Sequence, residues 1–128
     1  MKPFLLVLLL LLPALAEVPT GTPPADAPAA FARSSQVFVG TVVAVNKDKY
    51  GYPSLATVQV DQLYKGKLKG KVKVDGHGGP TYPARLFKEG QQLLFYLNDD
   101  LRADSYLNRV LPLTEASADL EYLKARLR

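Results

Sequence analysis

The sequence contains no cysteine and only one histidine, His77, in 128 residues. Without cysteine no disulfide can restrict the unfolded chain, so stability must come from the burial of an apolar core. A zinc site built from cysteine and histidine is excluded, and a nucleophile could find an imidazole base only in His77. These absences argue against an enzyme and a metal site, and they predict no bound cofactor.

Two phosphate-binding motifs are also absent, although glycine and lysine occur close together. A phosphate loop requires G-x-x-x-x-G-K-[ST], but only three residues separate Gly66 from Gly70, and neither serine nor threonine follows Lys71. The dinucleotide fingerprint G-x-G-x-x-G fails as well, because the glycine pair that begins at Gly76 leads to Thr81 at the third position. No nucleotide site is therefore expected.

The first sixteen residues have the three parts of a secretory signal peptide. Lys2 provides a positive start, residues 4–12 are entirely apolar, and Ala14-Leu15-Ala16 matches a cleavage site. The apolar stretch is too short for a transmembrane helix, which needs about 20 residues. We expect cleavage after Ala16, a secreted or periplasmic protein, and no membrane span after signal cleavage.

The segment 17–33 is rich in proline and alanine and is expected to be extended or loose. Within it, Asp26 can cap a short turn of helix that has Pro28 near its start, where a missing N–H is tolerated. The folded domain is expected to span residues 34–128.

Residues 35–113 predict five short β-strands, at 35–46, 54–65, 71–75, 91–98 and 105–113. The first strand has branched residues on both faces, with Val37, Val39, Val43 and Val45 on one side and Phe38 and Val42 on the other, so both faces should be covered. In the second strand the alternation changes after Asp61, which predicts a β-bulge at Asp61-Gln62. This bulge would place Val60 opposite Val74, Leu63 opposite Val72, and Asp61 opposite Lys73.

The connections carry turn residues, and the last segment is helical. Gly66 and Gly70 belong to the expected turn between the second and third strands, and the acidic segment 98–104 lacks the glycine and distal glutamate of a calcium loop. Residues 114–128 predict a helix capped by Thr114 or Ser117. Its apolar stripe comprises Leu113, Ala116, Leu120, Leu123 and Leu127.

This order of elements predicts a mainly β fold, a small five-stranded OB-like barrel with a C-terminal α-helix packed on it. A two-sheet sandwich is the competing architecture. The bend that a β-bulge introduces into a strand pair is what a small closed barrel needs at its corners, which favours the barrel.

Several short segments, taken in order, resemble the tissue-inhibitor-of-metalloproteinases-like (netrin-module-like) family. The resemblance covers roughly residues 28–123 and depends on order and spacing. The segments are Val37-Phe38-Val39-Gly40, Tyr64-Lys65-Gly66, the glycines Gly76, Gly78 and Gly79, Gly90 followed by Leu94-Phe95-Tyr96-Leu97, and Ala118-Asp119-Leu120.

The resemblance implies an OB barrel. Inhibitory members of that family use a cysteine at the mature N-terminus, whose amine and carbonyl chelate the zinc of the protease. The expected mature start here is Glu17-Val18, no cysteine occurs near Gly78, and Val110 stands where another would be expected. Metalloproteinase inhibition by that mechanism is therefore not expected, and the fold is what carries over.

The most distinctive charge pattern is a lysine at every second position, namely Lys65, Lys67, Lys69, Lys71 and Lys73. This alternation fits the solvent face of a half-buried strand, and lysine also protects exposed strand edges. The solvated face is the favoured interpretation, and a surface that binds an anionic polymer, such as envelope polysaccharide or lipid headgroups, is the alternative. OB barrels that bind nucleic acid add stacking aromatics, for which Tyr50, Tyr52 and Tyr64 are candidates, but export makes a nucleic-acid partner unexpected.

We therefore expect an exported non-catalytic binding module that binds another exported protein or an anionic envelope polymer. Its candidate contacts are the five lysines, Tyr50 and Tyr52 in the 47–53 loop, and His77 in the 76–83 loop. His77 also fits an exposed loop histidine without a task. The alternative function is a protease inhibitor that acts by loop insertion. The oligomeric state is left open by the sequence.

Overall fold

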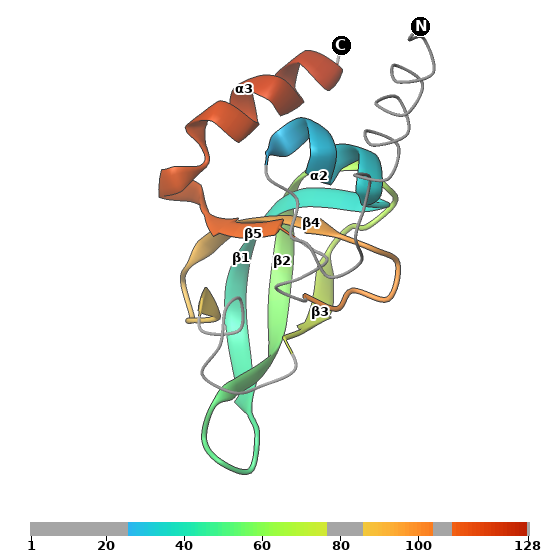
Figure 1. The fold of residues 1–128 in the computed structure, drawn as a ribbon. Helices are drawn as coiled ribbons and strands as arrows, with labels where there is room; N and C mark the ends of the chain where they lie inside the picture. The colour runs from blue at the N-terminus through green and yellow to red at the C-terminus, as the bar shows by residue number, and fades with distance from the viewer. Residues whose placement is uncertain (1–25, 77–85, 104–108, 128) are drawn as a thin grey trace, which may run out of the picture.

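The computed structural model describes residues 26–76, 86–103 and 109–127. The described chain forms a single five-stranded antiparallel sheet with the order β3-β2-β1-β4-β5, and two helices lie together over one side of it (Figure 1). The elements are α2 (Ala27–Arg33), β1 (Gln36–Lys47), β2 (Pro53–Lys65), β3 (Lys71–Asp75), β4 (Gln92–Leu97), β5 (Arg109–Pro112), the 3₁₀ helix η2 (Leu113–Glu115) and α3 (Ser117–Arg126). The predicted mainly β fold with a C-terminal helix is confirmed, and the strands of the described residues form one sheet, not the two sheets of a sandwich.

The two edges of the sheet, β3 and β5, do not pair with each other within the described residues. The end of β3 is nevertheless joined to the segment that follows β4. The backbone N–H of Asp75 donates to Leu101 O at 2.9 Å, and the N–H of Ala103 donates to Asp75 O at 2.7 Å. These two hydrogen bonds connect the edge strand β3 to the segment that follows β4 at one point.

The sheet buries apolar side chains on both faces. One cluster includes Phe38, Val58, Val74 and Phe95, with Phe38 stacked on Phe95 at 4.8 Å between ring centroids. The second cluster lies under the helices and includes Ala27, Ala30, Val37, Val39, Leu94, Tyr96, Leu111, Ala116 and Leu123. The prediction that β1 is covered on both faces is confirmed at Val37, Phe38, Val39 and Val42.

The second half of β1 departs from the predicted alternation. Val42 pairs with Val58 and Ala44 pairs with Thr57, so Val43 is left over as a bulge and is 40% exposed. Beyond this bulge the alternation is shifted, and Val45 packs against the cluster that contains Phe38. Placing Val45 on the face of Val37 was therefore wrong, and Val43 is partly exposed where a covered side chain was expected.

The predicted bulge at Asp61-Gln62 is confirmed, but its partner is β1 and not β3. Val39 pairs with Gln62 and Gly40 pairs with Val60, which leaves Asp61 unmatched. The predicted register between β2 and β3 is wrong, because Ala56 pairs with Val74, Val58 with Val72, and Thr57 with Lys73. The N–H of Val60 bonds to Gly70 O at 2.8 Å, so residues 61–65 extend beyond β3 and pair with β1 alone.

Local signals for turns and caps are largely confirmed in the first half of the chain. Gly66 and Gly70 have φ angles of 104° and 71°, which favour glycine. Asp26 accepts a hydrogen bond from Ala29 N at 3.1 Å and caps α2, which has a proline in its first turn. Ala27 and Ala30 are buried, so packing begins ahead of the expected boundary at residue 34.

The C-terminal helix is shorter than predicted. The chain first forms η2, and α3 then begins at Ser117 with Ala116 as its N-cap residue and no side-chain cap, so Thr114 and Ser117 were wrong candidates. Ala116 and Leu123 are buried, whereas Leu127 lies beyond the helix and is 52% exposed. Within the described ranges, no helix combines the length and apolar character needed to cross a membrane.

Candidate functional site

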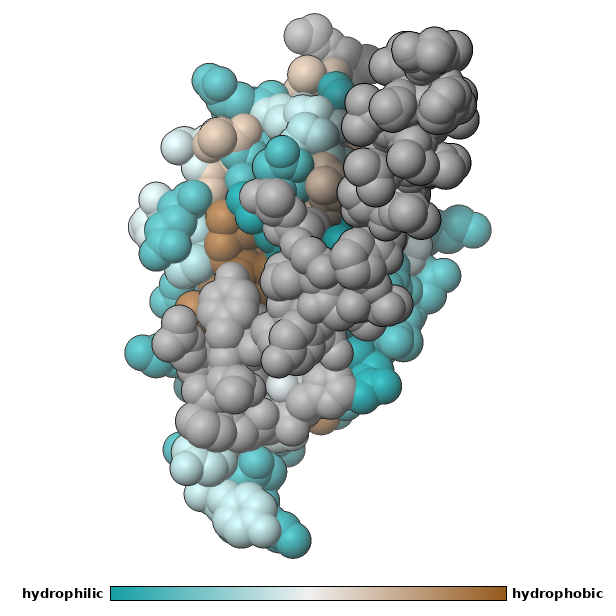
Figure 2. Space-filling model, in the orientation of Figure 1, coloured by the Kyte–Doolittle hydropathy of each residue, from teal (hydrophilic) through white to brown (hydrophobic). Residues whose placement is uncertain are grey.

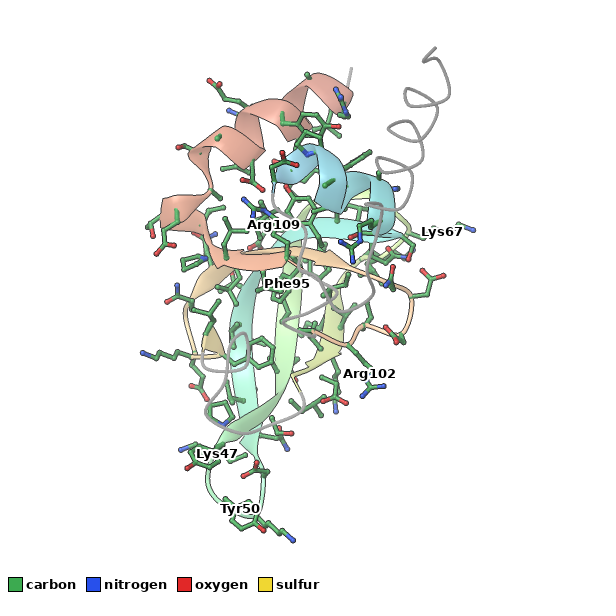
Figure 3. The ribbon with its side chains drawn as sticks, in the orientation of Figure 1. Lys47, Tyr50, Lys67, Phe95, Arg102 and Arg109 are labelled. Atoms are coloured by element: carbon green, nitrogen blue, oxygen red, sulfur yellow. The ribbon has the colours of Figure 1, made fainter. Side chains whose placement is uncertain are left out.

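Four of the five candidate lysines are exposed along β3 and the loop that precedes it. Lys67 and Lys69 lie in the loop 66–70, and Lys71 and Lys73 occupy alternate positions of β3, so they share one strand face. We call Lys67, Lys69, Lys71 and Lys73 the basic face. Lys67 projects from the edge of the molecule in Figure 3, and this edge is hydrophilic in Figure 2. None of the four ammonium groups forms an ion pair with a described residue.

The fifth lysine, Lys65, belongs to the fold and not to the basic face. Its side chain is half-buried, its Nζ donates to Phe31 O at 2.6 Å, and the same atom lies 4.6 Å from the centre of the Phe31 ring. Phe31 is in the last turn of α2, where carbonyl groups lack helical partners and a cation is favourable. Lys65 therefore joins the end of β2 to α2, and the expectation that it faces water was wrong.

The loop of the basic face is held in place by Gln36, the first residue of β1. Its Oε1 accepts a hydrogen bond from the backbone N–H of Lys67 at 3.0 Å, and its Nε2 donates to Asp99 Oδ1 at 2.9 Å. Ser35 Oγ donates to the same carboxylate oxygen at 2.8 Å. These hydrogen bonds from Gln36 and Ser35, together with the nearby charge of Lys67, lower the pKa of Asp99, which is exposed.

The strand beside the lysines of β3 is polar but uncharged where it faces them. Lys71 pairs with Gln59 and Lys73 pairs with Thr57. Gln59 Nε2 donates to Gly70 O at 3.3 Å. The carboxylate of Asp61, the bulge residue of β2, accepts a hydrogen bond from Thr41 Oγ1 at 2.6 Å. The basic face thus has hydrogen-bonding neighbours on β2, and no carboxylate of the described residues forms an ion pair with it, although the charge of Asp99 lies near Lys67.

Tyr50 and Tyr52 lie in the turn between β1 and β2, at the opposite end of β2 from the loop 66–70 (Figure 3). The carboxylate of Asp48 braces this turn, because Oδ1 accepts from Tyr50 N at 2.9 Å and from Tyr52 N at 3.0 Å. Tyr50 is 72% exposed and Lys49 Nζ lies 5.2 Å from its ring centre. The turn and the loop 66–70 are therefore two separate surfaces.

Tyr64, the remaining aromatic candidate, does not stand beside the exposed lysines. It is half-buried and packs against the apolar cluster under the helices, and this burial raises the pKa of its hydroxyl. The aromatic–basic alternation expected of a base-stacking surface is thus not formed by Tyr64 and the basic face. His77 and residues 77–83 of the glycine-rich loop lie outside the described residues.

A buried polar cluster was missed by the sequence analysis. Asp119 in α3 is only 4% exposed and accepts hydrogen bonds from Tyr96 Oη at 2.6 Å and from Arg109 Nε and Nη2, both at 2.9 Å. Burial raises the pKa of Asp119, but the hydrogen bonds from Arg109 and Tyr96 and the charge of Arg109 outweigh it and leave a net pKa below the usual range. Burial and the hydrogen bond to Asp119 raise the pKa of Tyr96 well above its ordinary value.

The helical spacing in the sequence already indicated that Asp119 is buried. Asp119 follows Ala116 by three residues and precedes Leu123 by four, so it lies on the buried face of the helix. A carboxylate at such a position requires a donor, and a buried charge is normally paired. The cluster joins α3 to β4 and β5, because Asp119 accepts hydrogen bonds from Tyr96 and Arg109, so we interpret it as a structural feature (Figure 3 labels Arg109).

The described residues offer no group of three or more His, Asp or Glu side chains placed to hold a metal ion. Two open depressions lie away from the basic face. One, of about 500 Å³, lies beside α3 and is lined by Ser117, Ala118, Leu120, Glu121 and Lys124. The other, of about 400 Å³, lies between the start of β4 and η2 and is lined by Gly90, Gln91, Gln92, Leu113 and Thr114.

Comparison with models of known protein families finds none that matches this chain, and no curated protein matches it either. The resemblance to tissue inhibitors of metalloproteinases therefore stays a prediction.

Proposed function

We propose that this protein is an exported, non-catalytic binding module of the tissue-inhibitor-like OB type, and that its basic face binds an anionic envelope polymer or an acidic surface of another exported protein. A curled OB barrel is compatible with the strand order β3-β2-β1-β4-β5 and with the hydrogen bonds that join Asp75 to Leu101 and Ala103. These features support the barrel, although the two edge strands do not pair within the described chain.

The observation that carries this proposal is the group of four exposed ammonium groups without an ion-pair partner among the described residues. Like charges on one strand and its loop repel one another, and a bound anion removes that repulsion. A structural reading competes with this one, because β3 is an edge strand and lysine on such a strand blocks association between sheets. The two readings differ in whether the lysines contribute to binding.

Retention on heparin across a salt gradient separates these readings. The wild type is compared with a variant in which Lys67, Lys69, Lys71 and Lys73 are changed to Gln. The matched control changes Lys47, Lys49, Lys88 and Lys124 to Gln, which removes the same charge from exposed positions elsewhere. We expect the wild type and the control to elute at similar salt and the basic-face variant to elute much earlier. Equal elution of the two variants contradicts the proposal, because binding would then follow net charge alone.

A second candidate function, protease inhibition by loop insertion, is favoured by the turn at residues 48–52. This turn ends a long β1–β2 hairpin that projects beyond the body of the sheet in Figure 1, and the Asp48 carboxylate holds its conformation. An exposed aromatic side chain on a braced turn is suited to a partner's pocket, and such preorganisation lowers the entropy cost of binding.

This second function is tested by incubating the protein with serine, cysteine and metalloproteases. Inhibition that is lost on changing Tyr50 to Ser, but kept on changing Lys88 to Gln, supports it. Full protease activity at every inhibitor concentration contradicts it.

Export itself is tested by the mass of the protein recovered outside the cytoplasm. Cleavage after Ala16 gives a mature chain that begins with Glu17. Recovery of the uncleaved chain in the cytoplasm contradicts this part of the proposal.

A further inference from the structure

The basic face has two parts, which are fixed by different interactions. Lys71 and Lys73 are held by the pairing of β3 with β2. Lys67 and Lys69 lie in a loop outside the strands, where the backbone N–H of Lys67 bonds to the Gln36 side chain. The loop lysines therefore depend on Gln36, whereas the strand lysines do not.

Gly66 shows how closely this loop approaches Gln36. Its φ of 104° favours glycine, and a Cβ at this position would overlap with Gln36 Oε1 and approach Ser35 O at 2.8 Å. The amide of Gln36 thus lies directly against the loop backbone on one side and holds Asp99 on the other. Since Asp99 is in the turn after β4, Gln36 connects three segments that are distant in sequence.

We propose that Gln36 is the positioning residue of the basic face, holding the loop 66–70 so that Lys67 and Lys69 extend the row formed by Lys71 and Lys73 and engage one linear polyanion together. This inference rests on the proposed anion-binding function. Alternate residues of a strand are about 7 Å apart, so a compact anion reaches only part of such a row, whereas a linear chain with repeated charges can follow it. A loop held in advance loses less entropy on binding than a free one.

Asp99 places a negative charge next to this loop, and Gln36 keeps it there. The carboxylate of Asp99 opposes an approaching polyanion, and the hydrogen bonds from Gln36 and Ser35, which lower its pKa, fix where that negative charge lies relative to Lys67. The amide of Gln36 is suited to this place because it offers an acceptor to Lys67 N–H and a donor to Asp99. A glutamate would lack the donor and add repulsion.

The test is a double-mutant cycle on the dissociation constant for heparin, read with the full protein at fixed salt. Gln36→Met keeps the side-chain length but removes both hydrogen bonds. It is combined with the loop pair Lys67→Gln and Lys69→Gln, or with the strand pair Lys71→Gln and Lys73→Gln. We expect Gln36→Met to weaken binding about 3- to 10-fold, the order of one lost charge contact. We also expect the loop-pair change to have a smaller effect in that background than in the wild type, while the strand-pair change keeps its full effect.

A charge-conserving swap provides the rescue. Gln36→Glu alone should weaken binding, whereas Gln36→Glu with Asp99→Asn exchanges the amide and the carboxylate, keeps the net charge and permits the same bridge. We expect the swap to recover most of the wild-type affinity. Gly66→Ala disturbs the loop from the other side and should reproduce the pattern of Gln36→Met, with circular dichroism and the melting temperature showing that each variant is folded.

The outcomes separate this inference from the proposed function. If the wild type binds heparin no better than the variant with all four lysines changed, the proposed function fails. If the wild type binds well but Gln36→Met binds equally well, or if loop and strand pairs lose equal shares of their effect in its background, the positioning role of Gln36 is overturned and the proposed function stands.

Discussion

The helix-covered end of the molecule and the basic face use the same kinds of charged residue in opposite ways. At the covered end, Arg109 is held by Asp119 at 2.9 Å, and Lys65 donates to the last turn of α2 at 2.6 Å. On the basic face, Lys67 to Lys73 have no ion-pair partner among the described residues. Charges with internal partners join elements of the fold, whereas charges without them are available to an external partner.

The two regions also differ in how stability should respond to the loss of their charged side chains. Every buried polar side-chain atom in the described ranges has a hydrogen-bond partner. Removal of one partner in the helix-covered region therefore leaves another buried group without a hydrogen bond. The exposed lysines are already solvated, and their loss strands nothing. The comparison therefore predicts that the loss of stability depends on how buried and how well partnered a charged side chain is, and not on which amino acid it is.

The largest expected effect is that of Asp119→Ala. This change removes the Asp119 carboxylate that accepts from the Arg109 guanidinium and the Tyr96 hydroxyl. Because the Arg109 side chain is 25% exposed, the expected loss is near the lower end of the about 3–5 kcal/mol that breaking a buried charge pair typically costs. Urea unfolding measures the loss. Glu121→Ala, an exposed position on the same helix, is the control and should change stability by less than about 0.5 kcal/mol. A loss no larger for Asp119→Ala than for Glu121→Ala breaks the comparison.

Acid should weaken the covered end through the same carboxylate. The pKa of Asp119 in the folded protein lies below its unfolded value of about 3.9, so its contribution is fully present above that pH and is lost as the pH falls through the folded-state pKa. The stability of the wild type should therefore fall more between about pH 5 and pH 2.5 than that of Asp119→Asn. Melting temperatures across this range measure the difference. Parallel pH curves for the two proteins contradict the assignment.

A smaller effect is expected for Lys65→Gln. It removes a charged hydrogen bond to Phe31 O and the contact with the Phe31 ring, both partly exposed, and about 1 kcal/mol is the expected loss of unfolding free energy. Lys65→Gln should have little effect on heparin affinity. If Lys65→Gln leaves stability unchanged but reduces heparin affinity, Lys65 takes part in anion binding together with the basic face.

The smallest effect is expected for Lys71→Gln with Lys73→Gln. Both side chains are exposed, so the change in stability should stay within about 0.5 kcal/mol, in either direction. The same urea unfolding experiment measures it. A loss above about 1 kcal/mol shows that these lysines have partners in the fold. The basic face would then not differ from the helix-covered region in how its charges affect stability.

Short-range signals in the sequence predicted much of the fold. The cap at Asp26, the glycines at 66 and 70 and the bulge at Asp61 each depend on neighbouring residues, and all three are found. The strand register failed because the bulge pairs with β1, a choice between two partner strands that local alternation does not encode.

The candidate site was predicted only in part for a related reason. Alternation placed Lys65 with the other lysines, but its environment is set by Phe31 of α2, which lies 34 residues earlier along the chain. The bridge from Gln36 to Asp99 spans 63 residues and leaves no pattern in sequence. Only the side-chain positions separate a lysine that holds the fold from one that is exposed to solvent.

The central claim, that the exposed lysines bind an anionic partner directly, is tested most directly by the salt dependence of heparin binding. Each lysine that contacts an anionic group releases about one counterion, which adds about one to the slope of log affinity against log salt. Changing Lys67, Lys69, Lys71 and Lys73 to Gln should therefore reduce the slope by about three to four. An unchanged slope, with wild type and variant equally sensitive to salt, would contradict the account and assign these lysines to edge protection alone.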